Sequence, residues 1–196
     1  MTIQDYLAQN ALGFEGDTFL RQHFQDLVNK HSIDTVIECG TYLGSTTKQL
    51  SGMVKQVYTI EINKEFYNEA KINLGACENV VQFLGNTIHV LPKVLEIIPN
   101  KKNLLIFVDS HWLAHNPLLE ELAIIALANI QPCIIVHDFK VPDHPELGFD
   151  SYNGQDYDYA WIEYSLSKIY PEGYNYYYNS EAIGARRGVI FIEPIQ

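Results

Sequence analysis

Short apolar runs alternate with amphipathic stretches along most of the chain. Five runs rich in Val, Ile, Leu and Phe are typical of strands that are buried on both faces of a sheet. Amphipathic stretches of helical length precede the first of these strands and separate the others. The first of these stretches begins at a polar residue suited to cap a helix. The predicted strands cover residues 35–37, 56–62, 80–84, 104–108 and 133–136, and the predicted helices cover 17–32, 45–53, 63–74, 88–97 and 118–128.

The end of the chain departs from this alternation. A further helix is predicted over 159–169, but the last two strands, 174–178 and 189–192, follow one another without a helix between them. Strands joined directly pair antiparallel, whereas strands separated by helices run parallel. The pattern therefore predicts an α/β fold with a doubly wound, mostly parallel seven-stranded sheet and an antiparallel last strand, in one domain over residues 1–196.

Two segments show no clear period. Residues 1–16 are mixed in polarity and are expected to form an arm or part of a lid. Residues 139–157 are rich in Pro, Gly, Asp and Tyr, and this loop is long enough to be functional. Its aromatic side chains could wall the binding site of an aromatic or sugar substrate, or form the contact of a homodimer, because tyrosine is enriched at interfaces. Those side chains are Phe149, Tyr152 and Tyr157.

Composition and charge narrow the possible partners. The chain has 196 residues and a net charge of −11, which argues against non-specific nucleic-acid binding. Its tight basic pairs, Lys101-Lys102 and Arg186-Arg187, are interpreted as solvated turns. Three widely spaced cysteines are typical of reduced thiols rather than of a disulfide framework. We find neither a signal-peptide pattern nor an apolar run of about 18–20 residues, so a cytoplasmic protein without a membrane span is expected.

Polar residues follow the five predicted strands of the alternating part. They are Glu38, Glu61, Asn86, Asp109 and Asp138. Any one of them could be an ordinary turn or cap residue. Because the carboxyl ends of parallel strands meet at one edge of a sheet, all five together outline an electronegative crevice. Such a crevice suits hydroxyl groups, an ammonium group or a cation.

A glycine turn lies at the first of these strand ends. Gly40 and Gly44 follow the strand, and Ser45 opens the next helix. A strand, a tight turn and a helix N-terminus together present backbone N–H groups to a small ligand. The carboxylate of Glu38 would repel a phosphate there but would accept a ligand that carries an amine.

These motifs in their order resemble the class I S-adenosylmethionine-dependent methyltransferases, in particular the small O-methyltransferases of the catechol type and their bacterial relatives. Residues 38–46 resemble the first motif, E-x-G-x-Y-x-G-x-S/T, and Glu61 the acid that ends the second strand. Residues 85–87 resemble the G-D/N-A/S turn. Asp109, with His111-Trp112 after it, resembles the segment after the fourth strand, and Asp138 the metal-binding aspartate. The resemblance covers about residues 17–140 and implies a Rossmann-like sheet of order 3-2-1-4-5-7-6.

The resemblance implies a binding site for S-adenosylmethionine. Glu61 would accept the ribose hydroxyls, and Asn86 and Thr87 would border the adenine. Glu38 and Asp109 would favour the cationic end of the cofactor, and the two glycines would let the backbone approach its methionine moiety. The residues expected to bind the cofactor are Glu38, Gly40, Thr41, Tyr42, Gly44, Thr46, Glu61, Asn86, Thr87 and Asp109. Tyr42 and Thr46 could equally be ordinary packing and first-turn residues.

The resemblance also implies a divalent cation, with Mg²⁺ as the candidate. Asp109 and Asp138 match two ligand positions, but Phe139 stands where a third ligand is expected. Nearby residues that could supply the third ligand are Asp143, His137 and His144.

The catalytic base of the catechol enzymes is a lysine, and the matching position here is Leu113. Catechol is therefore a doubtful substrate. Histidine is suited to proton transfer near pH 7, and His111 and His137 are the first candidates because they lie closest to the strand ends. The further candidates are His115 and His144. Asp109 is expected to act beside the base.

Three functions remain open at this stage. The first is methylation of a small-molecule hydroxyl with S-adenosylmethionine as the donor. The second is a catalytically silent S-adenosylmethionine-binding protein, which Leu113 and Phe139 favour. The third is an NAD-dependent oxidoreductase, because Glu61 also suits the ribose of NAD. The missing G-x-G-x-x-G pattern and the position of Glu38 argue against this last function.

Overall fold

The computed structural model describes residues 12–111 and 114–195, so most of the predicted N-terminal arm lies outside the described residues. The helices are η1 (Phe14–Gly16), α2 (Thr18–Lys30), α3 (Ser45–Ser51), α4 (Lys64–Asn73), α5 (Thr87–Ile97), α6 (Leu118–Leu127) and α7 (Tyr159–Ile169). The strands are β1 (Thr35–Cys39), β2 (Gln56–Glu61), β3 (Val80–Leu84), β4 (Leu104–Val108), β5 (Cys133–His137), β6 (Ser151–Tyr152), β7 (Gln155–Asp156), β8 (Tyr174–Tyr178) and β9 (Val189–Pro194).

Seven of the strands form one sheet in the order β3-β2-β1-β4-β5-β9-β8. The first five run parallel, and β9 lies antiparallel between β5 and β8. Both the predicted strand order and the antiparallel closing pair are confirmed. The carboxyl ends of β1, β2, β4 and β5 consequently meet at one edge of the sheet.

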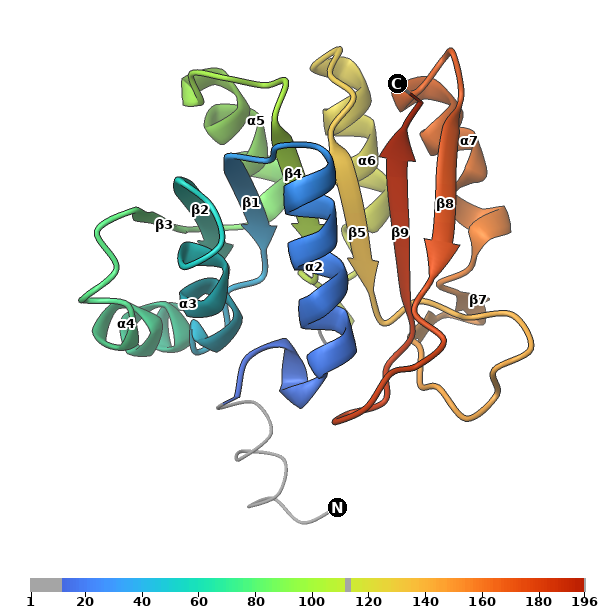
Figure 1. Cartoon of the computed structure of the whole chain (residues 1–196), viewed down its shortest axis with the longest axis horizontal. Helices are drawn as coiled ribbons and strands as arrows, with labels where there is room; N and C mark the ends of the chain where they lie inside the picture. Colours follow the sequence, from blue (N-terminus) through green and yellow to red (C-terminus); the bar gives the residue numbers. More distant parts are fainter. Residues whose placement is uncertain (1–11, 112–113, 196) are drawn as a thin grey trace.

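Helices cover both faces of this sheet (Figure 1). Alternate residues of each central strand enter two separate cores, as the pleat of a strand requires. Val36 and Phe107 pack with α2 on one face, and Ile37 and Ile106 pack with α5, α6 and α7 on the other. The fully apolar composition of β4 follows from this double burial, and all five residues of β1 are buried as well, Thr35 and Glu38 included.

Polar side chains begin several helices, including the first, for which the sequence predicts such a cap. The Asp17 carboxylate accepts hydrogen bonds from the backbone N–H groups of Phe19 and Leu20 at 2.9 and 3.0 Å. Asn63 and Asn86 cap α4 and α5 in the same way. None of the described helices is long and apolar enough to cross a membrane.

The loop 139–157 contains a small hairpin that the periodicity analysis did not predict. Strands β6 and β7 pair antiparallel around Asn153 and Gly154, which both have positive φ, at 54° and 81°. An Asn-Gly pair with two positive φ angles is the signature of a two-residue hairpin turn. That dipeptide was the available sequence signal, but strands of two residues are too short to show an alternating pattern.

Candidate functional site

A cavity of about 240 Å³ opens at the carboxyl ends of β1, β2 and β4. Ten of the predicted site residues line it: Glu38, Gly40, Thr41, Tyr42, Thr46, Glu61, Thr87, Asp109, His111 and Asp138. Gly44, Asn86 and His137 do not line it. Glu15 and His115 also line it. The sequence analysis placed Glu15 only within the N-terminal arm and ranked His115 as a secondary base.

Glu38 is fully buried beneath the cavity. Its Oε2 accepts hydrogen bonds from the hydroxyl groups of Thr47 at 2.5 Å and Thr59 at 2.7 Å. Its Oε1 has no hydrogen-bond partner among the described residues. Burial raises the pKa of Glu38 from 4.5 to about 8, although the two hydroxyl bonds oppose the rise. A cation from a ligand would offer this oxygen its missing partner.

Packing inside the protein explains why both positions of the turn are glycine. Gly40 has φ = 100°, and a Cβ at this position would overlap the backbone carbonyl of Asp109. Gly44 has φ = 80°, and a Cβ there would lie 3.0 Å from the Leu74 side chain. The close packing of β1 against β4 therefore requires Gly40, and the packing of α3 against α4 favours Gly44. The proposed approach of a cofactor to these backbones stays a prediction.

Glu61 ends β2 and lines the cavity with only 6% of its surface exposed. Its two carboxylate oxygens accept backbone N–H bonds, Oε2 from Tyr42 at 2.7 Å and Oε1 from Asn63 at 2.8 Å. Burial raises the pKa of Glu61, while these N–H groups act to lower it. The backbone N–H groups of Thr41 and Ile62 lower the pKa in the same way, so the backbone fixes the carboxyl group that lines the cavity.

Two predicted cofactor residues have structural partners in the protein. The hydroxyl of Thr46 accepts the backbone N–H of Phe14 at 2.8 Å, which fixes η1 against α3 and holds Glu15 at the cavity. The Asn86 side chain accepts the N–H of Ile88 at 3.1 Å as the cap of α5. Thr87 lines the cavity, and its buried hydroxyl also faces the Glu121 carboxyl group, whose pKa it acts to lower.

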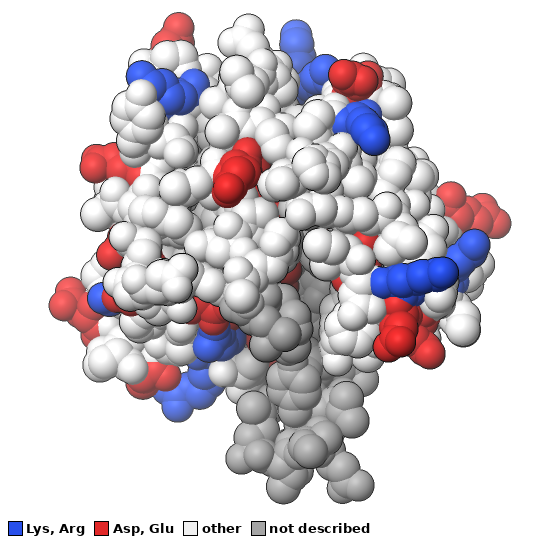
Figure 2. All heavy atoms as spheres, turned by 180° about the vertical axis from the view of Figure 1, so that it is seen from behind, with Lys and Arg blue, Asp and Glu red and all other residues white. Residues whose placement is uncertain are grey.

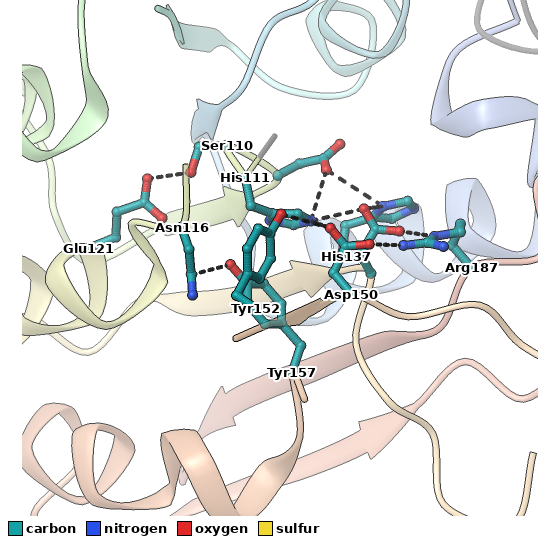
Figure 3. Close-up of polar contacts among 11 residues, drawn as sticks. Ser110, His111, Asn116, Glu121, His137, Asp150, Tyr152, Tyr157 and Arg187 are labelled. Carbon is teal, nitrogen blue, oxygen red and sulfur yellow. Dashed lines mark hydrogen bonds and ion pairs between the residues drawn. The ribbon is translucent and has the colours of Figure 1, made fainter. Parts of the chain in front are cut away.

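Two histidines and two aspartates meet at the ends of β4 and β5 (Figure 3). His111 Nε2 lies 2.9 Å from Asp138 Oδ2 and 4.0 Å from Asp109 Oδ1. His137 Nδ1 lies 3.3 Å from Asp138 Oδ2 and 3.6 Å from Asp109 Oδ1. Both imidazoles are buried. The sequence analysis named all four residues, and the structure brings them together.

The charges of this cluster depend on one another. Burial acts to lower the pKa of His137, but the carboxylates of Asp138 and Asp109 outweigh it and raise the pKa to about 10. The pKa of His111 is raised for the same reason. Burial raises the pKa of Asp109 to about 7 despite the pull of His137. The pKa of Asp138 stays well below its usual range because His137 and His111 outweigh its burial.

Arg187 completes this cluster, and the sequence analysis missed it. The pair Arg186-Arg187 was interpreted as a solvated turn, which is wrong for Arg187. Its guanidinium donates to Asp138 through Nε and to Asp150 through Nη2. The Tyr152 hydroxyl donates to the other oxygen of Asp150 at 2.9 Å. No local pattern marks Arg187, because its partners lie 49 and 37 positions away in the sequence.

The three aromatic residues predicted to matter in the loop 139–157 lie in different surroundings. Tyr157 is fully buried, with its ring centroid 4.8 Å from that of His111, and its hydroxyl donates to Asn116 at 2.5 Å. Tyr152 lies 6.4 Å from the His111 ring, whereas Phe149 packs under the ammonium group of Lys140. Tyr152 and Tyr157 are therefore the loop aromatics that reach the acidic cluster.

Of the candidate third metal ligands, His137 is in the cluster, whereas Asp143 and His144 are not. Phe139 is fully buried and stacks on Tyr178. Asp143 is exposed, and the His144 ring bonds to Glu146 at 2.9 Å. Two groups among the described residues bring ligand atoms within 4.8 Å of one another; they are Asp109, His137 and Asp138, and His111, Asp138 and Asp150. Leu113, the position of the missing lysine, lies outside the described residues, as does Trp112.

A further buried pair, also missed from the sequence, lies beside the cavity. Glu121 of α6 is fully buried, and its Oε1 accepts the Ser110 hydroxyl at 2.6 Å (Figure 3). Burial raises the pKa of Glu121. Since Ser110 directly follows Asp109, this bond fixes the chain at the point where the cavity meets the cluster.

Comparison with known proteins identifies the fold. No protein-family model and no curated protein sequence matches the chain. Among solved structures, an O-methyltransferase from Bacillus cereus in complex with SAH has a TM-score of 0.66 at 18% identity, over 97% of this chain and 87% of that one. The O-methyltransferase TomG from Streptomyces achromogenes, involved in tomaymycin synthesis and solved with SAM, has 0.58 at 16% identity, over 89% and 79%.

An rRNA methylase from Streptococcus thermophilus also matches, with a TM-score of 0.58 at 13% identity over 90% of this chain and 97% of that one. Because all three sequence identities are low, these structural similarities show the fold alone. The chain has the Rossmann-like fold that these class I methyltransferases share, as the sequence resemblance predicts.

Proposed function

We propose that this protein is a methyltransferase that transfers a methyl group from S-adenosylmethionine to a small-molecule hydroxyl. The observation that carries the proposal is the pair of buried carboxyl groups on one cavity. Glu61 lines the cavity and is held there by backbone N–H groups, and Glu38 has an oxygen without a hydrogen-bond partner among the described residues. This pair suits a ligand with vicinal hydroxyls and an ammonium group, and it opposes a phosphate.

These groups would bind the cofactor in one half of the cavity. Glu61 would accept the two ribose hydroxyls, and Glu38 would bind the ammonium of the methionine moiety. Thr87, which lines the cavity, would contact the adenine. Bound S-adenosylmethionine supplies a methyl group on a positively charged sulfur. Asp109, at the far side of the cavity, would favour that charge.

The half of the cavity that binds the methyl acceptor would lie against the cluster of two histidines and two aspartates. Methyl transfer needs the acceptor oxygen in line with the methyl group and a group that takes its proton. His111 lines the cavity, whereas His137 lies behind Asp109 and Asp138 and does not. We therefore assign the base to His111, and His137 becomes a buried neighbour that sets the charge of the two aspartates.

Surface charge favours a small acceptor over a nucleic acid. Figure 2 shows Lys and Arg side chains scattered singly among acids on the face opposite to that of Figure 1. The net charge of −11 and the acids around the cavity would repel a phosphate backbone. An RNA acceptor, which the name of one structural neighbour raises, is therefore disfavoured.

Calorimetry with the whole chain tests the cofactor. We expect S-adenosylhomocysteine to bind and NAD to show no heat of binding; the reverse result would contradict the proposal. Transfer of a labelled methyl group to a panel of phenols, sugars, amines and an RNA oligonucleotide then tests the reaction. Cofactor binding without turnover on any acceptor would favour the silent binding protein instead. His111→Asn should lower turnover while leaving the affinity for S-adenosylhomocysteine within about twofold.

A further inference from the structure

Arg187 reaches the acidic cluster because of the antiparallel strand β9. His137 pairs with Val189 in the register of β5 and β9, so Arg187 enters just beyond the carboxyl end of β5. Backbone bonds hold this entry. Phe139 N–H donates to the Gly188 carbonyl at 2.8 Å, and Gly148 forms a bridge to Arg187 in which Gly188 N–H donates to Gly148 and Gly148 N–H donates to Arg186. The sheet therefore fixes the backbone of Arg187, and with it the region that the guanidinium can reach.

The guanidinium occupies the acids that would otherwise bind a metal ion. It donates to Oδ1 of Asp138 and to Oδ1 of Asp150. The remaining oxygens of the two acids are bonded to His111 at 2.9 Å and to Tyr152 at 2.9 Å. In Figure 3 the Arg187 and His111 side chains approach the acids from opposite sides. A divalent cation bound to Asp138 would lie against a fixed positive charge.

Gly148 leaves space for the Arg187 side chain. A Cβ at Gly148 would lie 2.8 Å from Nη1 of Arg187 and 3.1 Å from its Cδ. The backbone of Gly148 is not in the left-handed region, and the absence of a Cβ leaves room for the Arg187 side chain in its present position. The third ligand position of a metal site is filled by Phe139, which is buried against Tyr178. These two observations are independent, and both disagree with a Mg²⁺ site.

We propose that Arg187 is a built-in cation that takes the place of a divalent metal ion at the acceptor end of the cavity. It neutralises Asp138 and Asp150 and, through them, positions the His111 ring and the Tyr152 hydroxyl. A planar fork that bonds two carboxylates suits this positioning role, which a lysine could fill only in part.

A consequence for the acceptor rests on the proposed methyltransferase function. Without a metal ion, the acceptor needs no pair of chelating oxygens and no Lewis acid. The acceptor oxygen forms its bond to the methyl carbon as the carbon–sulfur bond breaks, the sulfur keeps the electron pair, and the hydroxyl proton passes to His111. We therefore infer an acceptor with a single reactive hydroxyl, rather than a catechol.

Binding of Mn²⁺ alone tests the built-in cation without any assay of methyl transfer. We expect calorimetry to show no Mn²⁺ binding to the wild-type chain at millimolar concentrations. Arg187→Ala should gain a Mn²⁺ site, because the freed acids and histidines keep ligand atoms within 4.8 Å of one another. Arg186→Ala is the matched control, since it removes the same charge from an exposed neighbour and should gain nothing.

Two results would overturn the proposal. One is Mn²⁺ binding to the wild-type chain as tight as to Arg187→Ala; the other is a folded Arg187→Ala that gains no site. If Arg187→Ala does not fold, Gly148→Ala provides the second test. Its methyl group would displace the guanidinium, and Mn²⁺ binding should again appear, whereas a folded variant without it would contradict the proposal.

Assays of methyl transfer distinguish a positioning role of Arg187 from a purely structural one. Excess EDTA should leave wild-type turnover unchanged, and loss of turnover that Mg²⁺ restores would contradict the proposal. Arg187→Ala should lower kcat at least tenfold while the affinity for S-adenosylhomocysteine changes less than twofold, and Arg187→Lys should recover part of the loss. A chain that binds no S-adenosylhomocysteine would refute the proposed function, while the Mn²⁺ result would still decide the role of Arg187.

Discussion

The hydroxyl of Thr59 donates a 2.7 Å hydrogen bond to Glu38, and the two residues are also paired across the β1–β2 ladder. The side chain that holds the acid therefore comes from the neighbouring strand at the same height in the sheet. The bond reaches only one carboxyl oxygen, and the other has no hydrogen-bond partner among the described residues. Glu38 is thus fixed in orientation beneath the cavity but incompletely bonded.

This half-bonded acid predicts a pH-dependent stability. Because burial raises the pKa of Glu38 from 4.5 to about 8, the folded chain binds more protons than the unfolded chain between these values. The contribution of Glu38 to stability is therefore lost as the pH rises through this window, by about 1.4 kcal/mol for each pH unit. Glu38→Gln removes this dependence.

Urea denaturation at pH 5.5 and pH 7.5 measures the effect. The free energy of unfolding of the wild type, relative to Glu38→Gln, should fall between the two pH values. Glu96→Gln, at an exposed position on α5, should run parallel to the wild type. A difference between wild type and Glu38→Gln that does not change with pH would show that Glu38 is ionised throughout.

Glu61→Ala should weaken cofactor binding more than it weakens the fold. The carboxylate is proposed to accept two ribose hydroxyls, and a hydrogen bond to a charged group contributes about 1.5–3 kcal/mol. The expected loss of affinity for S-adenosylhomocysteine is on the order of 100-fold. Water in the cavity can replace the bonds to Tyr42 and Asn63, so the melting temperature should change little. Glu69→Ala, at an exposed position on α4, is the control, and equal affinities of the two variants would contradict the assignment.

Gly40→Ala should destabilise the protein and displace Asp109. Gly40 has φ = 100°, and an added Cβ would overlap the Asp109 carbonyl. Backbone strain of this kind costs about 1–3 kcal/mol before the overlap is counted. Gly52→Ala is the matched control, since Gly52 has φ = −82° and its nearest neighbour is a carbonyl oxygen at 3.5 Å. Thermal unfolding should show a clear loss for the first variant and none for the second; equal melting temperatures would be inconsistent with this packing.

Gly154→Ala should loosen the β6–β7 hairpin without touching the cofactor site. An added Cβ meets nothing within 4 Å, so its cost is the left-handed backbone at φ = 81°, about 1–2 kcal/mol. Chymotrypsin should then cut faster at Tyr152, while S-adenosylhomocysteine binds as before. Gly154→Asn should behave like the wild type because asparagine tolerates this conformation. Faster cleavage of the asparagine variant as well would point to a cause other than backbone conformation.

Much of the site could be predicted because its parts lie at strand ends. Glu38, Glu61, Asp109 and Asp138 each follow an apolar run, and parallel strands with helical connections bring those ends to one edge. The strand boundaries differ from the prediction by at most two residues, for example at β1, which extends through Glu38 to Cys39. That extension places Glu38 inside the buried strand.

Other features had no sequence signal of comparable strength. Gly44 and Thr46 belong to the predicted motif, yet their contacts are to Leu74 and to Phe14. Glu121 lies on an apolar helix, where its pairing with Ser110 depends on the rotation of that helix against β4. These outcomes depend on packing between elements, which a pattern along one element does not contain.

The sequence by itself determined the order of strands and helices, the two buried faces of the sheet and the row of acids at one edge. The reason is that hydrophobic period and chain connectivity are local properties that leave few arrangements. Only the tertiary structure decided what the acids bind. The antiparallel register of β9 carries Arg187 to Asp138, and the hairpin loop carries Asp150 to the same guanidinium. Whether an acidic cluster receives a metal ion or an arginine depends on such contacts between distant segments, because either cation satisfies the same charges.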